Sequence, residues 1–159
     1  MRINTLFRAN LALKLFGFAK IPLISFIGPK IIQIDDEKCI LRIKLKRRTK
    51  NHLNSMYLGS LAVGADLACG MLGLYHIQES NKNISLVFKD FKSKFLKRPD
   101  SDVDFICSDG IKVREMVRDT IETGLRQSFP CKIEAICKDE KVCEFTLTLS
   151  LRYYTKQLP

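Results

Sequence analysis

One carboxylate stands in the most apolar segment of the sequence. Residues 51–70, NHLNSMYLGSLAVGADLACG, contain Asp66 and no other charged side chain, although 28% of the residues in the chain are charged. A carboxyl group in apolar surroundings either forms hydrogen bonds that replace its hydration or has an elevated pKa suited to acid–base chemistry. Asp66 is therefore a candidate catalytic acid or base. The alternatives are a buried structural acid and an imperfection in a membrane-spanning helix.

The segment around Asp66 is predicted to be a long helix over about residues 56–77, with Ser55 as a candidate N-cap. Glycine destabilises a helix by up to about 1 kcal/mol relative to alanine, so four glycines here need a reason. The small residues are Gly59, Ser60, Ala62, Gly64, Ala65, Ala68, Gly70 and Gly73. A curved sheet wrapped closely around the helix would require them.

The flanking segments alternate apolar and polar residues, which is typical of half-buried strands. Strands are predicted over residues 30–35, 38–46, 83–97, 102–107, 131–137 and 142–154. We expect a bulge near Asp90, turns at residues 35–37 and 138–141, and an amphipathic helix over 109–127 that Asp109 or Ser108 caps and Pro130 follows. This order predicts an α+β fold with a mostly antiparallel sheet curled around one buried helix. The domain is expected to span 1–159.

The N-terminal region, residues 1–28, is predicted to form a helix and a lead-in to the first strand. It does not match a signal peptide, because basic residues interrupt its apolar run and no small-x-small cleavage pattern follows. The apolar residues of the helix are Leu6, Leu11, Leu13 and Phe16. They favour a helix that packs on the domain or on a partner, and the alternative is a helix on a membrane surface.

The net charge of +10 suits an anionic partner, although a basic surface also serves solubility alone. The basic residues alternate with apolar ones along predicted strands and do not interleave with exposed aromatic residues. Specific nucleic-acid binding is therefore not expected. The six cysteines form no C-x-x-C motif and no zinc-like spacing with the two histidines. We expect reduced core thiols, a cytoplasmic location and no metal site.

Residues 56–77 are long enough to cross a bilayer. However, an aspartate near the bilayer centre costs about 2.5–3.5 kcal/mol on insertion scales. A spanning helix would also divide strands of one predicted sheet between two compartments. No transmembrane segment is therefore expected.

The layout of these elements and the run N-H-x-N-S-M-Y-x-G-x-L-x-x-x-A-D-x-A-x-G, from Asn51 to Gly70, resemble the hotdog fold. The chain is similar to a thioesterase-like branch of unknown function that is related to PaaI-type acyl-CoA thioesterases. The segments 22-PLISFIGP-29 and 95-FLKR-98 also resemble patterns of that branch. This chain departs from the pattern of active PaaI-type enzymes at the start of the helix. Those enzymes carry His-Gly-Gly where this chain has Tyr57-Leu58-Gly59.

The resemblance implies a homodimer, or a dimer of dimers, with acyl-thioester sites at the subunit interface. It implies that Asp66 acts as a general base or nucleophile on the thioester of acyl-CoA or acyl carrier protein. The backbone N–H groups of Leu58 and Gly59 would polarise the thioester carbonyl. Asn51 would orient water or the carbonyl group, and Tyr57 could donate a hydrogen bond.

Four basic residues surround a strand that approaches coenzyme A in hotdog enzymes: Lys92, Lys94, Lys97 and Arg98. They could pair with its phosphates or with an acidic carrier protein, and the alternative is a solvated strand face. No cofactor is expected, and His52 and His76 are interpreted as structural. The missing His-Gly favours a second function, a non-catalytic hotdog module that binds acyl-CoA or acyl carrier protein.

Overall fold

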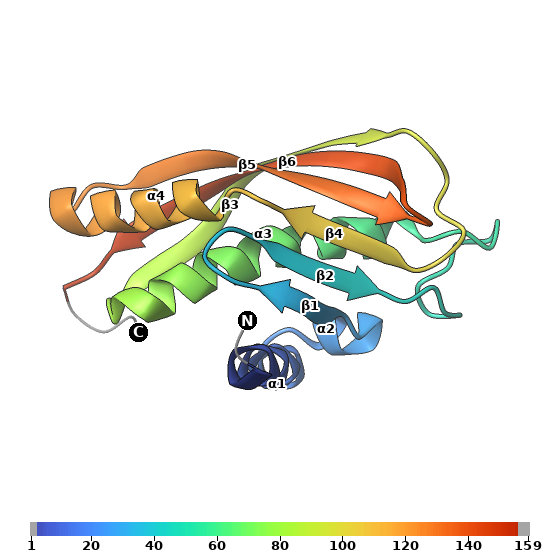
Figure 1. Ribbon diagram of the computed structural model, residues 1–159, viewed down its shortest axis with the longest axis horizontal. Helices are drawn as coiled ribbons and strands as arrows, with labels where there is room; N and C mark the ends of the chain where they lie inside the picture. The colour runs from blue at the N-terminus through green and yellow to red at the C-terminus, as the bar shows by residue number, and fades with distance from the viewer. Residues whose placement is uncertain (1–2, 156–159) are drawn as a thin grey trace.

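The computed structural model describes residues 3–155, with side chains from residue 6 onward (Figure 1). The helices are α1 (Ile3–Ala19), α2 (Pro22–Ile27), α3 (Leu58–Ser80) and α4 (Gly110–Thr123). The strands are β1 (Lys30–Ile34), β2 (Cys39–Ile43), β3 (Ile84–Phe95), β4 (Val103–Cys107), β5 (Gln127–Cys137) and β6 (Glu140–Tyr153). The predicted α+β order is confirmed, and the short helix α2 is an addition that the sequence pattern did not indicate.

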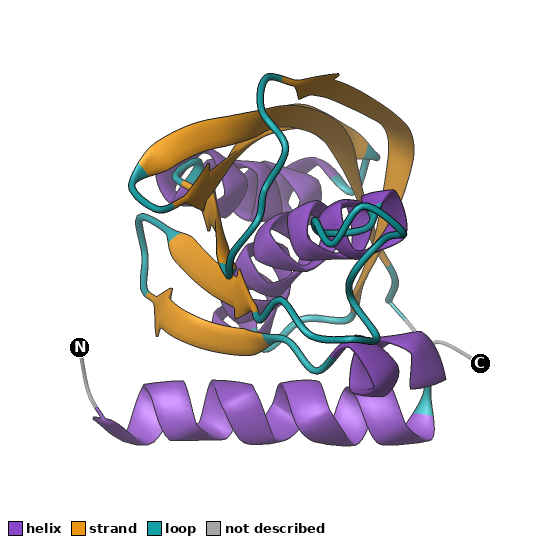
Figure 2. Cartoon of the chain, turned by 90° about the vertical axis from the view of Figure 1, so that its right-hand side faces the viewer, coloured by secondary structure: helices purple, strands orange, loops and turns teal. Residues whose placement is uncertain are grey.

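The strands form one antiparallel sheet in the order β1-β2-β4-β5-β6-β3. Figure 2 shows this sheet arched around α3, with α1 along the open side of the arch. A curved sheet around a central helix is the architecture of the hotdog fold. The predicted fold is therefore confirmed. The inserted helix α4 packs against α3, β5 and β6.

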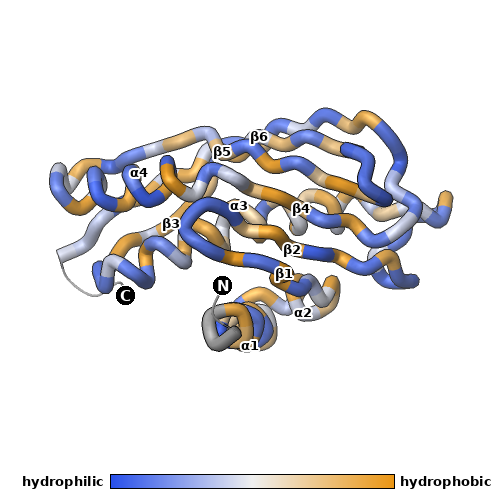
Figure 3. Tube along the Cα trace, in the orientation of Figure 1, coloured by the Kyte–Doolittle hydropathy of each residue, from blue (hydrophilic) through white to orange (hydrophobic). Residues whose placement is uncertain are grey.

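Alternation along the strands turns their apolar side chains towards α3. In β2, Cys39, Leu41 and Ile43 are fully buried, whereas Arg42 between them is exposed and its Nε pairs with Oδ1 of Asp104 at 2.6 Å. Figure 3 shows the same alternation of apolar and polar residues along the other strands. The sequence period of two therefore sets which face of the sheet forms the core.

The small residues of α3 leave space for the close approach of the sheet, as predicted. This is clearest at two of its glycines. A Cβ atom at Gly64 would overlap the ring of Phe105 on β4, and one at Gly73 would lie 2.5 Å from Cδ1 of Leu86 on β3. A Cβ atom at Gly70 would meet only the Phe88 ring, at 3.8 Å, which is ordinary contact. Close approach of the sheet therefore requires glycine at position 64, whereas a larger residue at 73 would have to displace the end of the Leu86 side chain and one at 70 would displace nothing.

Among the described residues, α3 alone is long and apolar enough to cross a membrane by length and composition. Half of its apolar window is buried inside the protein. Its buried residues, from Ser60 to Ile77, pack against the sheet and α4. The helix is thus the core helix of the fold, as predicted.

The helix α1 packs on the domain through only part of the predicted set of apolar residues. Leu13 is buried and Leu6 packs against the core, as predicted, and Gly17 is also buried, while Leu11 and Phe16, which were predicted to pack as well, are exposed. The side chain of Asn10 fixes the orientation. Its Nδ2 donates to the Ile31 carbonyl oxygen and its Oδ1 accepts from the Ile31 N–H, each at 2.9 Å.

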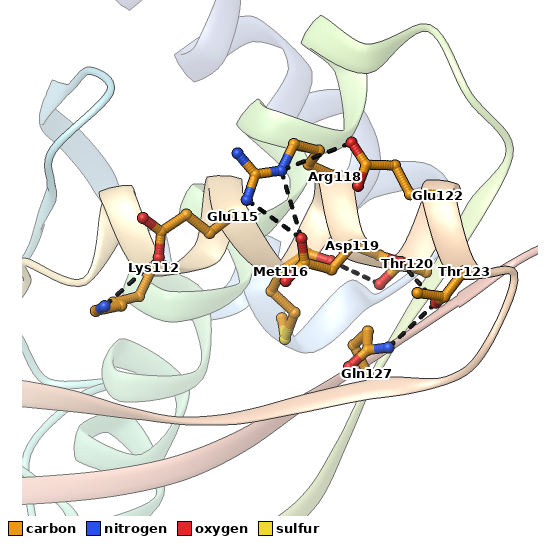
Figure 4. A network of polar contacts seen from close by, with 9 residues as sticks. All are labelled: Lys112, Glu115, Met116, Arg118, Asp119, Thr120, Glu122, Thr123 and Gln127. Atoms are coloured by element: carbon orange, nitrogen blue, oxygen red, sulfur yellow. Dashed lines mark hydrogen bonds and ion pairs between the residues drawn. The ribbon is translucent and has the colours of Figure 1, made fainter.

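The predicted helix over 109–127 is too long at its C-terminal end. Gly124 adopts φ +66° and ends α4, and Thr123 Oγ1 then accepts a hydrogen bond from Gln127 at the start of β5 (Figure 4). Pro130 lies inside β5, opposite Thr148 of β6. It is tolerated because the pairing of β5 with β4 covers only residues 133–136, so no partner strand needs its missing N–H.

Candidate functional site

Asp66 lies half-buried on the side of α3 that faces the edge strand β3. It opens on a groove of about 320 Å³, which is lined by Ala62, Val63, Asp66, Phe88, Asp90, Phe91 and Leu147. Burial raises the pKa of Asp66 above its usual value. Within residues 3–155, no hydrogen bond or ion pair reaches its carboxylate, so the acid braces no other element of the described chain.

A second carboxylate, which the sequence did not suggest as a site residue, lines the same groove. The predicted bulge is confirmed in β3, where the register shifts between Phe88 and Phe91 and so leaves Asp90 opposite Thr148. Asp90 accepts hydrogen bonds from Thr148 Oγ1, at 2.9 and 2.8 Å, and from the Thr148 N–H at 3.3 Å. The two acids therefore differ, since Asp90 is held by β6 and Asp66 faces the groove unpaired.

A second groove, of about 460 Å³, continues along the seam between α3 and β3 towards the start of the helix. Its lining is Asn51, Met56, Leu58, Leu61, Phe95, Leu96, Lys97, Arg98 and Pro99. Leu61 and Ala62 are adjacent on α3, and Phe95 and Phe91 are neighbours on one face of β3. The two grooves thus lie end to end along one seam.

The helix α3 begins at Leu58, two residues later than predicted. Tyr57, and not Ser55, is the N-cap, and the Tyr57 side chain forms no capping hydrogen bond. Leu61 N–H donates to the Tyr57 carbonyl oxygen as the first intrahelical bond. The N–H groups of Leu58 and Gly59 therefore have no acceptor within the helix. The exposed ring of Tyr57 lies against Gly59, since a Cβ atom there would be 2.7 Å from Cε1 of the ring.

Asn51 forms a loop-stabilising contact and also lines the second groove. Its Oδ1 accepts hydrogen bonds from the N–H groups of Leu53 and Ser55, at 2.9 and 3.1 Å, and from Ser55 Oγ at 3.2 Å. Ser55 is consequently used in this loop and does not cap the helix. The carboxamide nitrogen of Asn51 is the group that could still donate to a bound molecule.

The four basic residues of the prediction divide between two places. Lys97 and Arg98 line the second groove, and Lys97 Nζ pairs with Glu140 at 2.6 Å on the surface. Lys92 and Lys94 alternate with Phe91 and Phe95 on β3, so they project from the opposite face of the strand. The structure therefore brings only Lys97 and Arg98 together with Asn51 and Leu58.

The two histidines lie outside both grooves. His76 is buried beside Tyr75, its Nε2 has no hydrogen-bond partner within the described residues, and burial lowers its pKa. His52 is exposed in the loop before α3. Neither one is placed to serve as the catalytic histidine that the sequence lacks at position 57.

All six cysteines are buried free thiols, as predicted. Three of them, Cys69, Cys107 and Cys131, have sulfur atoms within 4.8 Å of one another, which is near enough to share one metal ion. They come from α3, β4 and β5, line neither groove, and lie in the core with the other apolar residues. Their position agrees with packing as small hydrophobic residues.

Solved structures that share this fold include those of three bacterial proteins. A Chlorobaculum tepidum protein of unknown function is 18% identical with a TM-score of 0.81, and covers 94% of this chain and 97% of its own. A Pseudomonas aeruginosa protein of unknown function, described as a probable thioesterase, is 22% identical with a TM-score of 0.77, at 91% and 95% coverage. A mutant thioesterase from Pseudomonas aeruginosa is 15% identical with a TM-score of 0.70, at 94% and 94% coverage.

These similarities, at low identity, confirm the predicted hotdog fold. No curated protein matches the sequence. The model of one family, described as a domain of unknown function, DUF4442, matches residues 9–151. This match spans most of the chain, which therefore belongs to the DUF4442 family.

Proposed function

We propose that the protein is a thioester hydrolase that acts on acyl-CoA or on acyl carrier protein, with Asp66 as its general base or nucleophile. The observation that carries this proposal is the Asp66 carboxylate, which is half-buried and unpaired within the described chain and faces an apolar groove. A structural acid would need a partner, whereas a base needs an open position for water. The solved structures named as thioesterases support the same class of reaction.

In this mechanism a water molecule transfers a proton to Asp66 as it attacks the thioester carbonyl carbon. The developing oxyanion accepts hydrogen bonds from N–H groups at the start of α3, at Leu58 and Gly59. The C–S bond then breaks, and the thiol leaves with a proton. The raised pKa of Asp66 favours proton uptake, because burial makes its carboxylate a stronger base.

Asp66 and Gly59 of one chain cannot both reach the same carbonyl group. They are seven residues apart on α3, and a rise of 1.5 Å per residue separates them by about 10 Å along the helix axis. A complete site would therefore combine Asp66 of one protomer with the helix start of a second. This requirement supports the proposal of a homodimer, alone or as half of a tetramer.

The edge strand β3 is the proposed contact between the protomers. Within residues 3–155 it pairs only with β6, which leaves its outer edge open, and it exposes Val87, Phe91 and Phe95. An open apolar edge strand is a template for pairing with a second copy, and a two-fold axis there would bring two α3 helices together.

The acyl chain would then occupy the apolar groove beside Phe88 and Phe91. The second groove would take the pantetheine arm, to which Asn51 in its lining could donate a hydrogen bond, and the exposed Tyr57 between the lining residues Met56 and Leu58 could donate another. Lys97 and Arg98 are placed to pair with phosphate or carrier-protein carboxylates. Lys92 and Lys94, on the other strand face, could contact only an outer part of the ligand. Free thiols in the core agree with the reducing conditions of the cytoplasm.

The test is the release of free thiol from a panel of acyl-CoA and acyl carrier protein thioesters of different chain lengths. Asp66→Asn should lower turnover by about 10²–10⁴-fold. Asp119→Asn, which makes the same change at a partly exposed side chain of α4, should leave turnover unchanged. Absence of turnover with every thioester would refute the proposal.

Tyr57 at the start of α3 favours a second candidate function, a non-catalytic module that binds acyl-CoA or acyl carrier protein. A phenol hydroxyl can donate a hydrogen bond but does not replace histidine as a general acid–base group. This function predicts that acyl-CoA raises the melting temperature of both the wild type and Asp66→Asn, with no thiol release from either.

A further inference from the structure

The first two helices expose an unusual number of large apolar side chains. Figure 2 shows α1 as a rod along one side of the molecule, with the rest of the chain on one side of it only. The exposed residues are Phe7, Leu11, Leu15, Phe18, Leu23 and Phe26. Phe18 is 83% exposed and Phe7 is 67% exposed. Large apolar side chains exposed together on two helices that are in contact mark an interaction site.

This surface is a second apolar face of α1, distinct from its packing face. The packing face contains Leu13 and Gly17, and the hydrogen bonds between Asn10 and Ile31 hold it against β1. Phe7 and Leu11 are four residues apart and Phe18 follows seven later, so they form a stripe on the solvent side of the helix. Since the inner face is already occupied, rotation of α1 could not bury the outer stripe.

Exposed cations border this stripe, and acidic residues are missing from it. Arg8, Lys14 and Lys20 are exposed along α1, and the sequence contains no aspartate or glutamate before Asp35. Phe26 of α2 lines a shallow pocket together with Lys46, Arg47 and Arg48. The Arg48 guanidinium lies against Gly28 at the end of α2, where a Cβ atom would be 2.7 Å from its Nη2.

We propose that the α1–α2 surface, formed by these aromatic and basic side chains, binds the surface of an anionic lipid bilayer. The phenylalanine rings would enter the acyl-chain region, and the lysine and arginine side chains would contact phosphate groups. An exposed apolar stripe with flanking cations has this preference, and each cation adds about 1 kcal/mol near an anionic membrane. The inference does not depend on the thioester chemistry proposed for Asp66.

A second copy of the chain fits this surface less well. A two-fold contact would place the cations of one copy against those of the other, in a protein of net charge +10. The open edge of β3, which is the proposed dimer contact, lies at the opposite end of the sheet from β1, to which α1 is attached. Charge complementarity therefore selects the lipid surface.

The first experiment measures sedimentation of the full chain with vesicles of phosphatidylcholine, with and without phosphatidylglycerol. We expect binding to the anionic vesicles, which weakens as salt is raised. The Phe7→Ser/Phe18→Ser double variant should bind at least about tenfold more weakly, since two aromatic side chains no longer enter the bilayer. Leu125→Ser, at an equally exposed leucine beyond α4, is the control and should bind as the wild type does.

The second experiment uses the absence of tryptophan from the sequence. Phe18→Trp introduces a single tryptophan, which can be excited apart from the four tyrosines and whose emission should shift to the blue with anionic vesicles and be quenched by brominated lipids. Leu125→Trp should show neither effect. Equal binding to neutral and anionic vesicles, or no spectral shift at position 18, would overturn the proposal. So would a fall in oligomer mass in the Phe7→Ser/Phe18→Ser variant without loss of vesicle binding, because the surface would then be a protein contact.

Discussion

The ring of Phe105 on β4 occupies the space beside Gly64 of α3 in which any larger residue would place its Cβ atom. Gly64→Ala should therefore destabilise the protein by about 1–3 kcal/mol, as overpacked core substitutions do. Gly70→Ala on the same helix is the matched control. Its Cβ atom would meet only ordinary contacts, so the helix preference for alanine should stabilise the protein by up to about 1 kcal/mol. Urea unfolding of both variants measures the difference. Equal stability of the two would contradict the clearance argument.

The sequence predicted this packing because glycines in a long apolar helix destabilise it unless a neighbouring element must approach its backbone closely. Alternation likewise predicted β2 and the buried face of β6. Local patterns of this kind depend on residues that are close in the chain, so they can be read without knowledge of the fold. Asp66 was identified for the same reason, as a single charge within an apolar run.

The remaining features depend on residues that are distant in the chain. Asp90 joined the site only through the bulge that places it at Thr148, 58 residues away. Of the residues predicted to pack on α1, Leu11 and Phe16 were wrong, because apolar residues occur on both sides of the helix and only Asn10 distinguishes them. Pro130 indicated the end of a helix, but it lies in a strand whose neighbour ends before reaching it.

Asp66→Asn should have opposite effects on stability and activity. Burial raises the pKa of Asp66 in the folded state, so the native protein favours the protonated form and loses stability as pH rises above the unfolded value of 3.8. That penalty persists at neutral pH, and asparagine removes it. The variant should unfold at a higher temperature than the wild type at pH 7, with a smaller difference near pH 4. If Asp66 is the base, kcat should fall by about 10²–10⁴-fold.

Thermal unfolding from pH 4 to 8, with thiol release measured on the same samples, tests both effects. A variant that is less stable than the wild type at every pH would indicate a bracing role for Asp66. A stabilised variant that retains full turnover would leave the stability argument intact and remove Asp66 from the mechanism.

His76 should make the protein sensitive to mild acid. Burial lowers its pKa from 6.5 in the folded state, where Asp36, Glu79 and Arg114 are the charged groups around it. The unfolded chain therefore binds a proton more readily, and stability is lost as pH falls below 6.5 towards the folded-state pKa. For one titrating group, the free energy of unfolding cannot change by more than about 1.4 kcal/mol per pH unit.

The two histidines of the sequence provide a matched pair for this test. His76→Gln should reduce the dependence of the free energy of unfolding on pH between 5 and 7. His52→Gln, at an exposed loop position, should keep the wild-type dependence. If the His76 variant keeps the full wild-type pH dependence of the free energy of unfolding, that dependence comes from other groups.

The bulge in β3 should depend on Thr148, because this residue supplies both hydrogen-bond donors to Asp90. Thr148→Val removes the hydroxyl donor and should destabilise the protein by about 0.5–1.5 kcal/mol. It should also weaken thioester hydrolysis through KM more than through kcat, because Asp90 shapes the groove and Asp66 remains in place.

Thr146→Val, two residues earlier on β6 and opposite the regular part of β3, is the control. Denaturant unfolding and steady-state kinetics of the two variants give both readouts. A selective loss of kcat in Thr148→Val would instead place Asp90 in the reaction itself, as a second acid beside Asp66.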